Sequence, residues 1–395
     1  MPIATKIKAS IERSSWIRKM FEEGDRLRAR YGAENVFDFT IGNPSVEPPA
    51  ELHEMLLELA RKPIPGMHRY MSNAGYEETR AAVAEVLAEQ SGLAVNAQHI
   101  VMTCGAGGAL NVVLKTLLNP GEEVIILTPF FVEYKFYIDN HGGVPVEVWT
   151  DRNTFQLDLA AIDAAITTKT RAIIVNTPNN PTGVIYPADS LRALGKLLRA
   201  KEAEFGGSIT VISDEPYARI AYDGQRVPSI FTCIDNAVVV TSHSKDLALP
   251  GERIGYLAAN PKMTDVGEFI EGAIFCNRTL GFVNAPALAQ RLVTRLQRAS
   301  VDIDEYRAKR DLLYNRLTEL GFAMVKPGGG FYLFPKSPLA DDIEFVTIAQ
   351  RANILLVPGT GFGAPGFFRI AYCSEMKMIE RSLSAWEKLA HELGL

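Results

Sequence analysis

The sequence predicts an α/β protein: a large domain with a mostly parallel sheet flanked by helices, plus a smaller α+β domain. Three observations support this. From about residue 99 to residue 240, short apolar segments alternate with helical segments, which is typical of parallel strands joined by helical crossovers. Segments such as Val124-Ile125-Ile126-Leu127 are apolar throughout, as expected for strands buried on both faces. The 395 residues are enough for two domains.

The elements expected before the sheet are helices and irregular turns. Apolar residues at helical spacing predict an amphipathic helix over about 11–31, and an alanine-rich segment predicts another over about 76–90. Between them, an extended piece runs into Gly42-Asn43-Pro44, where glycine permits close approach of the backbone. The sequence allows two interpretations of this turn: it contacts the substrate, or it is only a linker.

The strands of the large domain are short and polar at their ends. We place them at residues 100–103, 124–127, 144–149, 172–175, 210–213 and 238–240. One helix is expected over 106–118, and another follows the second strand and ends at residue 141.

The pattern changes after Asn260-Pro261. A long helical stretch over about 285–320, either continuous or broken, is followed by short strands and a final helix over 375–393, which indicates the smaller α+β domain. If the first helix packs with this lobe, the smaller domain is discontinuous. We therefore expect a large domain over 45–290 and a small domain made of 1–44 and 291–395.

Composition excludes several classes of protein. The net charge is −5 and no basic tract is present, so neither nucleic acid nor an anionic membrane is an expected partner. No apolar run of eighteen residues and no apolar leader occur, which predicts a cytoplasmic protein. The four cysteines and six histidines lack the spacing of a disulfide framework or a metal site, so no metal is expected.

The segment around Lys245 is the first candidate for chemistry. Three valines predict a buried strand, and Thr241-Ser242-His243-Ser244 leaves Lys245 at the strand's exit, where α/β proteins place reactive groups. Low-dielectric walls and the nearby Arg253 would lower the lysine pKa and free its amine to attack a carbonyl. Ser242 and Arg253 would suit a phosphate. Without further evidence, a solvated surface lysine explains the same pattern.

A glycine-rich turn opens the helix that follows the first strand. Gly105, Ala106 and Gly107 offer backbone N–H groups and a positive dipole end to a phosphate. A nicotinamide-binding turn is the alternative, but Leu110 occupies its third glycine position and the next strand ends in Thr128 rather than an acidic residue.

Three further strand ends carry suitable side chains. Phe131 follows the second strand and can stack on a heteroaromatic ring, although core packing is the simpler fate of a phenylalanine. Asn180 lies in a turn fixed by two prolines. Asp214, in Asp214-Glu215-Pro216-Tyr217, ends a buried strand and needs a partner, either an arginine or the protonated nitrogen of a pyridine ring.

Together these residues identify a family by resemblance. The matching positions are Tyr70 with Gly75, Gly105-Ala106-Gly107, Phe131, Asn180-Pro181-Thr182-Gly183, Asp214 with Tyr217, Ser242 with Ser244 and Lys245, Arg253, and Phe368-Arg369. This set resembles the class I/II aminotransferases, fold-type-I enzymes that depend on pyridoxal 5'-phosphate, over nearly the whole chain.

The resemblance implies a role for each residue. Lys245 would carry the cofactor as a Schiff base, Asp214 would pair with its ring nitrogen, and Tyr217 and Asn180 would bind its phenolic oxygen. Phe131 would stack on the ring. The phosphate would be held by Ser242, Arg253, the amides of Gly105, Ala106 and Gly107, and Tyr70 from the neighbouring subunit of a homodimer with shared sites.

Substrate recognition is also implied by resemblance. Arg369 matches the arginine that clamps the α-carboxylate of the amino acid, and the Gly42 backbone would complete that grip. Phe131 stands where tyrosine or tryptophan is common, and Gly107 and Gly108 replace hydroxyl residues of the phosphate turn.

We therefore expect an aminotransferase that moves the amino group of an L-amino acid to a 2-oxo acid such as 2-oxoglutarate. Aspartate is the first choice of donor because Arg278 lies one residue from a position where some relatives bind a distal carboxylate. Arg278 is equally explained as a solvated or interface arginine. The alternatives are an alanine or aromatic aminotransferase, a carbon–sulfur β-lyase, and a binding protein with an inactive cofactor site.

Overall fold

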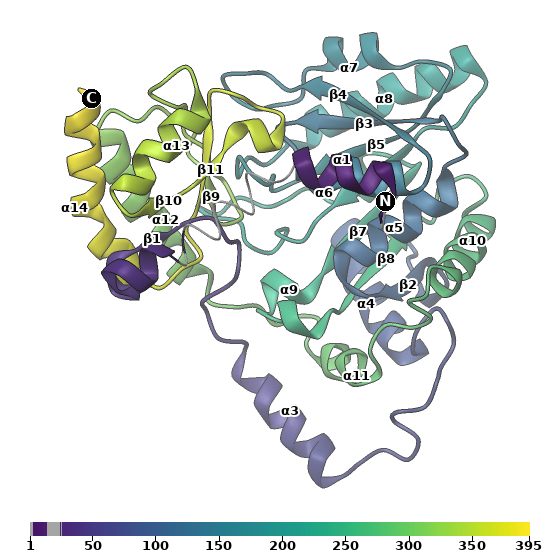
Figure 1. Cartoon of the computed structure of the whole chain (residues 1–395). Helices are drawn as coiled ribbons and strands as arrows, with labels where there is room; N and C mark the ends of the chain where they lie inside the picture. Colours follow the sequence, from purple (N-terminus) through teal and green to yellow (C-terminus); the bar gives the residue numbers. More distant parts are fainter. Residues whose placement is uncertain (1–2, 14–23, 25) are drawn as a thin grey trace. The chain divides into compact units, whose positions relative to one another are not determined.

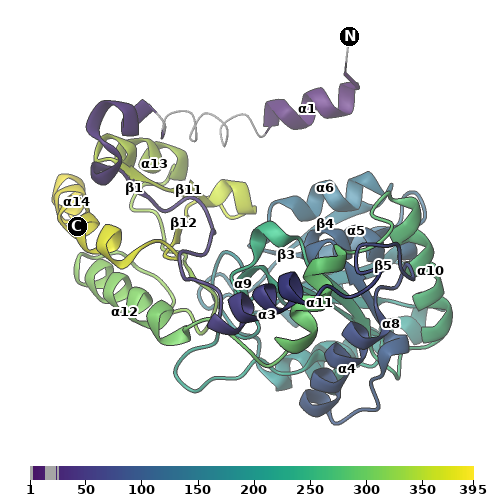
Figure 2. The same cartoon turned by 90° about the horizontal axis from the view of Figure 1, so that it is seen from below.

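The structure, a computed structural model, describes residues 3–13, 24 and 26–395 (Figures 1 and 2). The chain divides into two compact units. The larger comprises Pro44–Asp304 and Lys326–Gly330, and the smaller comprises Met1–Asn43, Glu305–Val325 and Phe331–Leu395. Residues 291–304, which the sequence assigned to the small domain, lie in the larger unit.

The larger unit is built on a seven-stranded sheet in the order β2-β8-β7-β6-β5-β3-β4. The strands are β2 (Ile100–Thr103), β3 (Glu123–Thr128), β4 (Val144–Trp149), β5 (Thr170–Asn176), β6 (Thr210–Asp214), β7 (Ala237–Ser242) and β8 (Gly255–Ala259). The strands β3 to β7 pair in parallel, and β8 lies antiparallel between β2 and β7. The predicted mostly parallel sheet is confirmed, and β8 is a strand that the sequence pattern did not predict.

Helices flank this sheet and supply its core. They are α3 (Ala50–Arg61), α4 (Glu77–Ser91), α5 (Gly105–Leu117), α6 (Glu133–Asn140), α7 (Leu159–Ala165), α8 (Ala188–Phe205), α9 (His243–Asp246), α10 (Val266–Thr279) and α11 (Ala287–Arg295), with 3-10 turns η2 (Ala97–His99), η3 (Ile230–Thr232) and η4 (Pro250–Glu252). Buried side chains of α5, α6 and α10, such as Val113, Ile138 and Ala273, share one apolar cluster with the central strands. Burial of this cluster holds the strand ends that carry the candidate site.

The smaller unit combines short strands with helices. Its elements are α1 (Thr5–Arg13), η1 (Ala33–Asn35), β1 (Phe37–Asp38), most of α12 (Ile303–Glu319), β9 (Tyr332–Leu333), α13 (Asp342–Arg351), β10 (Ile354–Leu355), β11 (Val357–Pro358), η5 (Gly359–Phe362), β12 (Phe368–Ala371) and α14 (Met376–Leu393). β1 pairs with β10 in parallel, and β11, β12 and β9 form an antiparallel sheet. The buried Trp386 of α14 packs edge-on against Phe322, with ring centroids 5.5 Å apart.

Two predicted helical stretches can be compared with the described residues. Of the helix expected over 11–31, residues 14–23 and 25 lie outside the described residues, while α1 ends at Arg13 and residues 26–31 are helical. The stretch expected over 285–320 is two helices, α11 and α12. Among the helices described, we find none with the length and apolar character needed to cross a membrane.

Candidate active site

Lys245 and Asp214 emerge at the same end of two neighbouring strands. β7 ends at Ser242, and the short helix α9 carries Lys245 directly after it. β6 runs parallel to β7 and ends at Asp214, opposite Val240. Because parallel strands present their carboxyl ends at one edge of the sheet, both side chains belong to that edge.

The Asp214 carboxylate is buried and only half satisfied. Its side chain is 4% exposed. Oδ2 accepts a hydrogen bond from the Tyr134 hydroxyl, whereas Oδ1 has no hydrogen-bond partner within the described residues. Burial raises the pKa of Asp214 to about 7, and the Tyr134 hydrogen bond partly opposes this rise. A protonated pyridine nitrogen would supply the missing donor, so this residue fits the cofactor that the resemblance implies.

Asn176, at the end of β5, connects two of the predicted residues. Its Nδ2 donates to the backbone carbonyl of Asp214 at 2.8 Å, and its Oδ1 accepts from the backbone N–H of Asn180 at 2.6 Å. Asn176 and Asn180 are both buried. The Asn180 turn is thereby fixed relative to the end of β6.

Aromatic side chains surround the Asp214 carboxylate. The rings of Phe131 and Tyr134 meet edge-on, with centroids 5.5 Å apart. Tyr217 is buried and lies near enough to Tyr134 to contribute to its raised pKa, although burial and Asp214 contribute more. The structure thus brings Phe131, Asp214 and Tyr217 together around Tyr134.

Gly105 and Arg253 form a cradle for an anion at the start of α5. Gly105 has φ +73°, and a Cβ built there would lie 3.0 Å from Nη2 of Arg253. The guanidinium is therefore held at the N-terminus of α5, with Nη1 donating to the Pro250 carbonyl at 2.9 Å. The helix dipole and the guanidinium both favour negative charge, so a phosphate fits this position, with Ala106 and Gly107 in the first turn.

Gly255 makes this cradle possible. It pairs with Ser242 across β7 and β8. A Cβ at Gly255 would lie 2.9 Å from the Cα of Gly105 and would overlap the Thr241 carbonyl oxygen. Only glycine allows α5 to begin this close to Ser242 and the strand that leads to Lys245.

Arg369 and Gly42, both in the smaller unit, share a neighbour. Arg369 lies on β12, is 8% exposed and donates through Nη2 to the Thr40 carbonyl at 2.6 Å. The centroids of the Tyr332 and Phe362 rings lie 4.6 and 4.8 Å from its guanidinium carbon. A Cβ at Gly42 would overlap the Tyr332 hydroxyl. Tyr332 thus contacts both residues, Gly42 at its hydroxyl and Arg369 over its ring.

Tyr70 and Arg278 lie on the surface of the larger unit. The Tyr70 side chain is 91% exposed. Arg278, in the last turn of α10, has its guanidinium carbon 5.4 Å from the centroid of the exposed Phe275 ring. Tyr70 borders a hollow of about 200 Å³ that Phe282 also lines, and Arg278 is not among its lining residues.

Sequence reasoning missed four residues that contact the predicted set. They are Tyr134, Asn176, Tyr332 and Phe362. Tyr134 could have been found from the sequence, since it is an aromatic residue three positions after Phe131 and within the helix that follows the same strand. The contacts of Asn176 with Asp214 and of Tyr332 with Arg369 and Gly42 join residues far apart in the chain, and Phe362 meets Arg369 across a turn, so strand-end spacing does not show them.

Comparisons with known proteins agree with this site. The family described as "Aminotransferase class I and II" matches residues 34–385. The chain is 34% identical over 379 residues to an aspartate/prephenate aminotransferase of Thermus thermophilus, covering 93% of this chain and 94% of that one. It is 32% identical over 394 residues to aromatic-amino-acid aminotransferase 2 of Thermococcus litoralis, covering 96% of this chain and 97% of that one.

A solved structure shares the whole fold. The crystal structure of an aminotransferase from Eubacterium rectale superposes with a TM-score of 0.96 at 38% identity and covers 100% of both chains. The family match, the identities and the shared fold agree with one another. The chain therefore belongs to the class I and II aminotransferases, enzymes that depend on pyridoxal phosphate.

Proposed function

We propose that this aminotransferase takes its amino group from L-aspartate and passes it to a 2-oxo acid such as 2-oxoglutarate. The observation that carries the proposal is the half-satisfied Asp214 carboxylate at the strand end beside Lys245. The choice of aspartate is supported by the name of the Thermus thermophilus relative, an aspartate/prephenate aminotransferase. The name of the Thermococcus litoralis relative supports an aromatic donor as the second candidate.

Asp214, Phe131, Asn180 and Tyr217 would orient the cofactor. When bound, pyridoxal phosphate withdraws electrons from the bonds at the Cα of the amino acid. Asp214 would keep a proton on the ring nitrogen by accepting a hydrogen bond from that N–H at its Oδ1. Phe131 would lie against the ring, and Asn180 and Tyr217 would donate to its phenolic oxygen.

The cradle at α5 would hold the phosphate. Ser242, Arg253 and the amides of Gly105, Ala106 and Gly107 would bind its oxygens. Arg369 and the Gly42 backbone would bind the α-carboxylate of the amino acid through parallel hydrogen bonds.

Lys245 would act as the general acid and base. Its Nζ would take the proton from Cα of the amino acid and return it at C4′ of the cofactor, an effect worth roughly 10²–10⁴ in rate. The position of Lys245 directly after β7 supports this role.

We further propose that two chains form a homodimer in which Tyr70 reaches the phosphate of the partner's site, and that Arg278 recognises the distal carboxylate of aspartate. The exposure of Tyr70 supports the first idea, because a tyrosine that is 91% exposed can serve a second chain. The two compact units would be the large and small domains of the enzyme. The acidic, ordinary composition supports function in the cytoplasm.

An absorbance experiment tests the proposal. Purified enzyme loaded with pyridoxal phosphate is recorded before and after adding L-aspartate, with no acceptor present. We expect the band of the Lys245-bound cofactor to be replaced by that of pyridoxamine phosphate, and 2-oxoglutarate to restore it. Lys245→Ala should abolish the exchange, whereas the exposed Lys196→Ala should leave it unchanged.

Two results would contradict parts of this proposal. No response to aspartate, with a response to tyrosine, phenylalanine or alanine, would remove the aspartate assignment and the role of Arg278. Release of ammonia and pyruvate from a sulfur amino acid without an acceptor would identify a β-lyase instead.

A further inference from the structure

Helix α6 directs two tyrosines toward the proposed cofactor site. Tyr134 and Tyr137 are three positions apart in α6, so their side chains lie on the same face of the helix. The Tyr134 hydroxyl donates to Asp214 at the edge of the sheet. The Tyr137 hydroxyl reaches a different place, because a Cβ built at Gly107 would lie 3.1 Å from its oxygen. One hydroxyl therefore meets the carboxylate that would bind the ring nitrogen, and the other meets the first turn of α5.

This turn of α5 is the anion cradle that Gly105 and Arg253 form. Gly107 belongs to it, and its free backbone N–H groups favour a negative ligand. Nη2 of Arg253 approaches the turn at Gly105, where it lies 3.0 Å from a Cβ built on that glycine. The turn itself, Gly105-Ala106-Gly107, carries no side-chain hydroxyl. A guanidinium and a phenol thus approach the same helical turn from outside it.

A contact between α5 and α6 fixes this arrangement. Nδ2 of Asn111, one helical turn further along α5, donates to the Gly107 carbonyl at 2.8 Å. Oδ1 of Asn111 lies 3.1 Å from Nε2 of His141, the residue that caps the C-terminus of α6. Because an amide oxygen can only accept, the imidazole is the donor in this bond. The end of α6 is therefore tied to the same turn of α5 that Tyr137 approaches.

The Tyr137 hydroxyl is protonated at neutral pH and can donate. Burial raises its pKa to about 12, and Glu133 and Asp214 add to this rise, while Arg253 opposes it. The ring is partly buried and packs against the apolar cluster of α5, α6 and α10. Within the residues that the structure describes, the hydroxyl makes no hydrogen bond. An anion bound at the first turn of α5 would supply the acceptor.

We propose that Tyr137 binds the phosphate of pyridoxal phosphate by donating a hydrogen bond from its hydroxyl. A tyrosine of α6 would then supply the hydroxyl that the first turn of α5 lacks, beside the place where a side chain at Gly107 would project. This proposal rests on the α5 cradle as the phosphate site, and it does not depend on which amino acid the enzyme transaminates.

The test compares two ligands that differ only in the phosphate. Pyridoxal phosphate and pyridoxal are titrated separately into the cofactor-free enzyme, and the dissociation constant of pyridoxal divided by that of pyridoxal phosphate measures what the phosphate contributes. We expect Tyr137→Phe to lower this ratio at least about tenfold, because the lost hydrogen bond goes to a charged group. Pyridoxal itself should bind as in the parent enzyme, and this result also verifies the fold of the variant.

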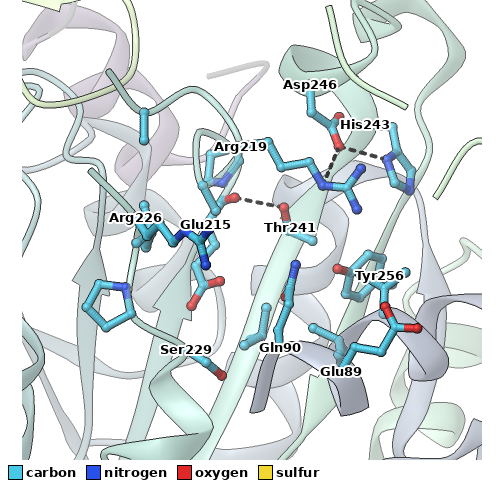
Figure 3. A pocket seen from close by; sticks show the side chains of 18 of the residues that line it. Glu89, Gln90, Glu215, Arg219, Arg226, Ser229, Thr241, His243, Asp246 and Tyr256 are labelled. Atoms are coloured by element: carbon cyan, nitrogen blue, oxygen red, sulfur yellow. Dashed lines mark hydrogen bonds and ion pairs between the residues drawn. The ribbon is translucent and has the colours of Figure 1, made fainter. Parts of the chain in front are cut away.

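Tyr256→Phe is the matched control. A Cβ at Gly255 would point at α5, so Tyr256, the next residue of β8, faces the opposite side of the sheet. There it lines a cavity of about 640 Å³ together with Thr241 and Glu215 (Figure 3). The change removes one hydroxyl from a buried tyrosine near the same strand ends but on the other face, so the ratio should stay unchanged.

A double variant tests the position of the hydroxyl. Gly107→Ser alone would place its Cβ 3.1 Å from the Tyr137 oxygen. In Tyr137→Phe that oxygen is absent, and the nearest ring carbon lies 3.8 Å from the position of the new Cβ. Adding Gly107→Ser to Tyr137→Phe should therefore recover most of the lost affinity for pyridoxal phosphate, since serine supplies a hydroxyl at the same turn.

Three outcomes would overturn the proposal. An equal ratio in Tyr137→Phe and Tyr256→Phe would show that the Tyr137 hydroxyl does not bind the phosphate. Equal weakening of pyridoxal and pyridoxal phosphate would show that it acts on the ring or on the fold. A double variant that recovers no affinity would show that the hydroxyl does not act at the first turn of α5.

Arg253→Gln separates this proposal from the cradle on which it rests. An unchanged ratio in Arg253→Gln would move the phosphate away from α5 and would refute both the cradle and the role of Tyr137. A lowered ratio in Arg253→Gln, with an unchanged ratio in Tyr137→Phe, would refute the role of Tyr137 alone.

Discussion

Tyr134 and Asp214 form a buried, hydrogen-bonded pair at the centre of the proposed site. A hydroxyl that donates to a carboxylate favours the ionised form, which opposes the effect of burial. Tyr134 therefore helps Asp214 to remain charged, as it must to keep a proton on a pyridine nitrogen.

Tyr134→Phe should lower kcat/KM about tenfold to a hundredfold, because a hydrogen bond to a charged group contributes about 1.5–3 kcal/mol. The spectrum of the bound cofactor should also shift its pH dependence, a signature that a merely packing role would not give. Steady-state kinetics and a pH titration of the absorbance measure both. Tyr31→Phe, which changes an exposed tyrosine, is the control; unchanged kinetics in Tyr134→Phe would refute the role.

Asp214→Asn should stabilise the protein without its cofactor, and increasingly so as pH rises. Burial raises the folded-state pKa of Asp214 from 3.8 to about 7, so the folded protein binds this proton more tightly than the unfolded chain. The stability that the proton provides is therefore lost as pH rises from about 4 to 7, and no further loss occurs above 7.

Asparagine does not titrate, so the advantage of Asp214→Asn should grow by about 2 kcal/mol between pH 5 and pH 7, since the slope of about 1.4 kcal/mol per pH unit flattens near the folded-state pKa. Urea unfolding of the two cofactor-free proteins at several pH values measures this difference. A difference that stays constant with pH would show that Asp214 does not titrate as its burial indicates.

Among the elements, β8 controls how closely α5 approaches the strand that leads to Lys245. In Gly255→Ala the new Cβ would overlap both Gly105 and the Thr241 carbonyl oxygen, so α5 or β7 would have to move away from β8. We expect at least a tenfold loss of pyridoxal phosphate affinity and a lower Tm, measured by cofactor titration and thermal unfolding. Gly207→Ala is the matched control, because a Cβ there meets nothing within 4 Å. Equal behaviour of the two variants would contradict the role of Gly255.

The sequence predicted strands well where β-branched and other apolar residues of high strand propensity follow one another, and it missed a buried strand of weak propensity. β3, β5, β6 and β7 are continuous apolar runs, so their positions were readable. β8, with the sequence Gly-Tyr-Leu-Ala-Ala, has weak strand propensity and becomes a strand only because β2 and β7 offer hydrogen bonds on both sides. The same limit applies to the site. Lys245 and Asp214 could be predicted because each lies at the end of a strand that the local sequence indicates. Asn176 and Tyr332 are identified only by their contacts in the structure with Asp214 and Arg369.

At the scale of the whole molecule, the exposed Tyr70 predicts an active site completed by a second chain. Sedimentation should show a dimer. Tyr70→Ala should bind pyridoxal phosphate at least tenfold more weakly, and Lys245→Ala should be inactive. If Tyr70 acts across the interface, a hybrid of these two chains has one site with both defects and one intact site.

Mixing the two variants under conditions that exchange subunits should therefore produce hybrid dimers with one intact site of two. At low cofactor concentration, each hybrid dimer should have up to about half of the activity of a parent dimer. As a control, each variant alone is taken through the same exchange procedure and should gain no activity. If Tyr70 serves its own chain, the hybrids will regain nothing, because each site then carries one defect.

The two rings beside Arg369 limit the shape of the anion that the enzyme can accept. Tyr332 and Phe362 lie close to the guanidinium carbon, so an incoming ligand must approach along the edge of the group and in its plane. A flat carboxylate meets this demand with two parallel bonds, while a tetrahedral phosphonate or sulfonate directs its oxygens out of that plane. The enzyme should therefore discriminate by anion geometry as well as by charge, and 1-aminophosphonic acids should be poor ligands even when their side chains match a good substrate.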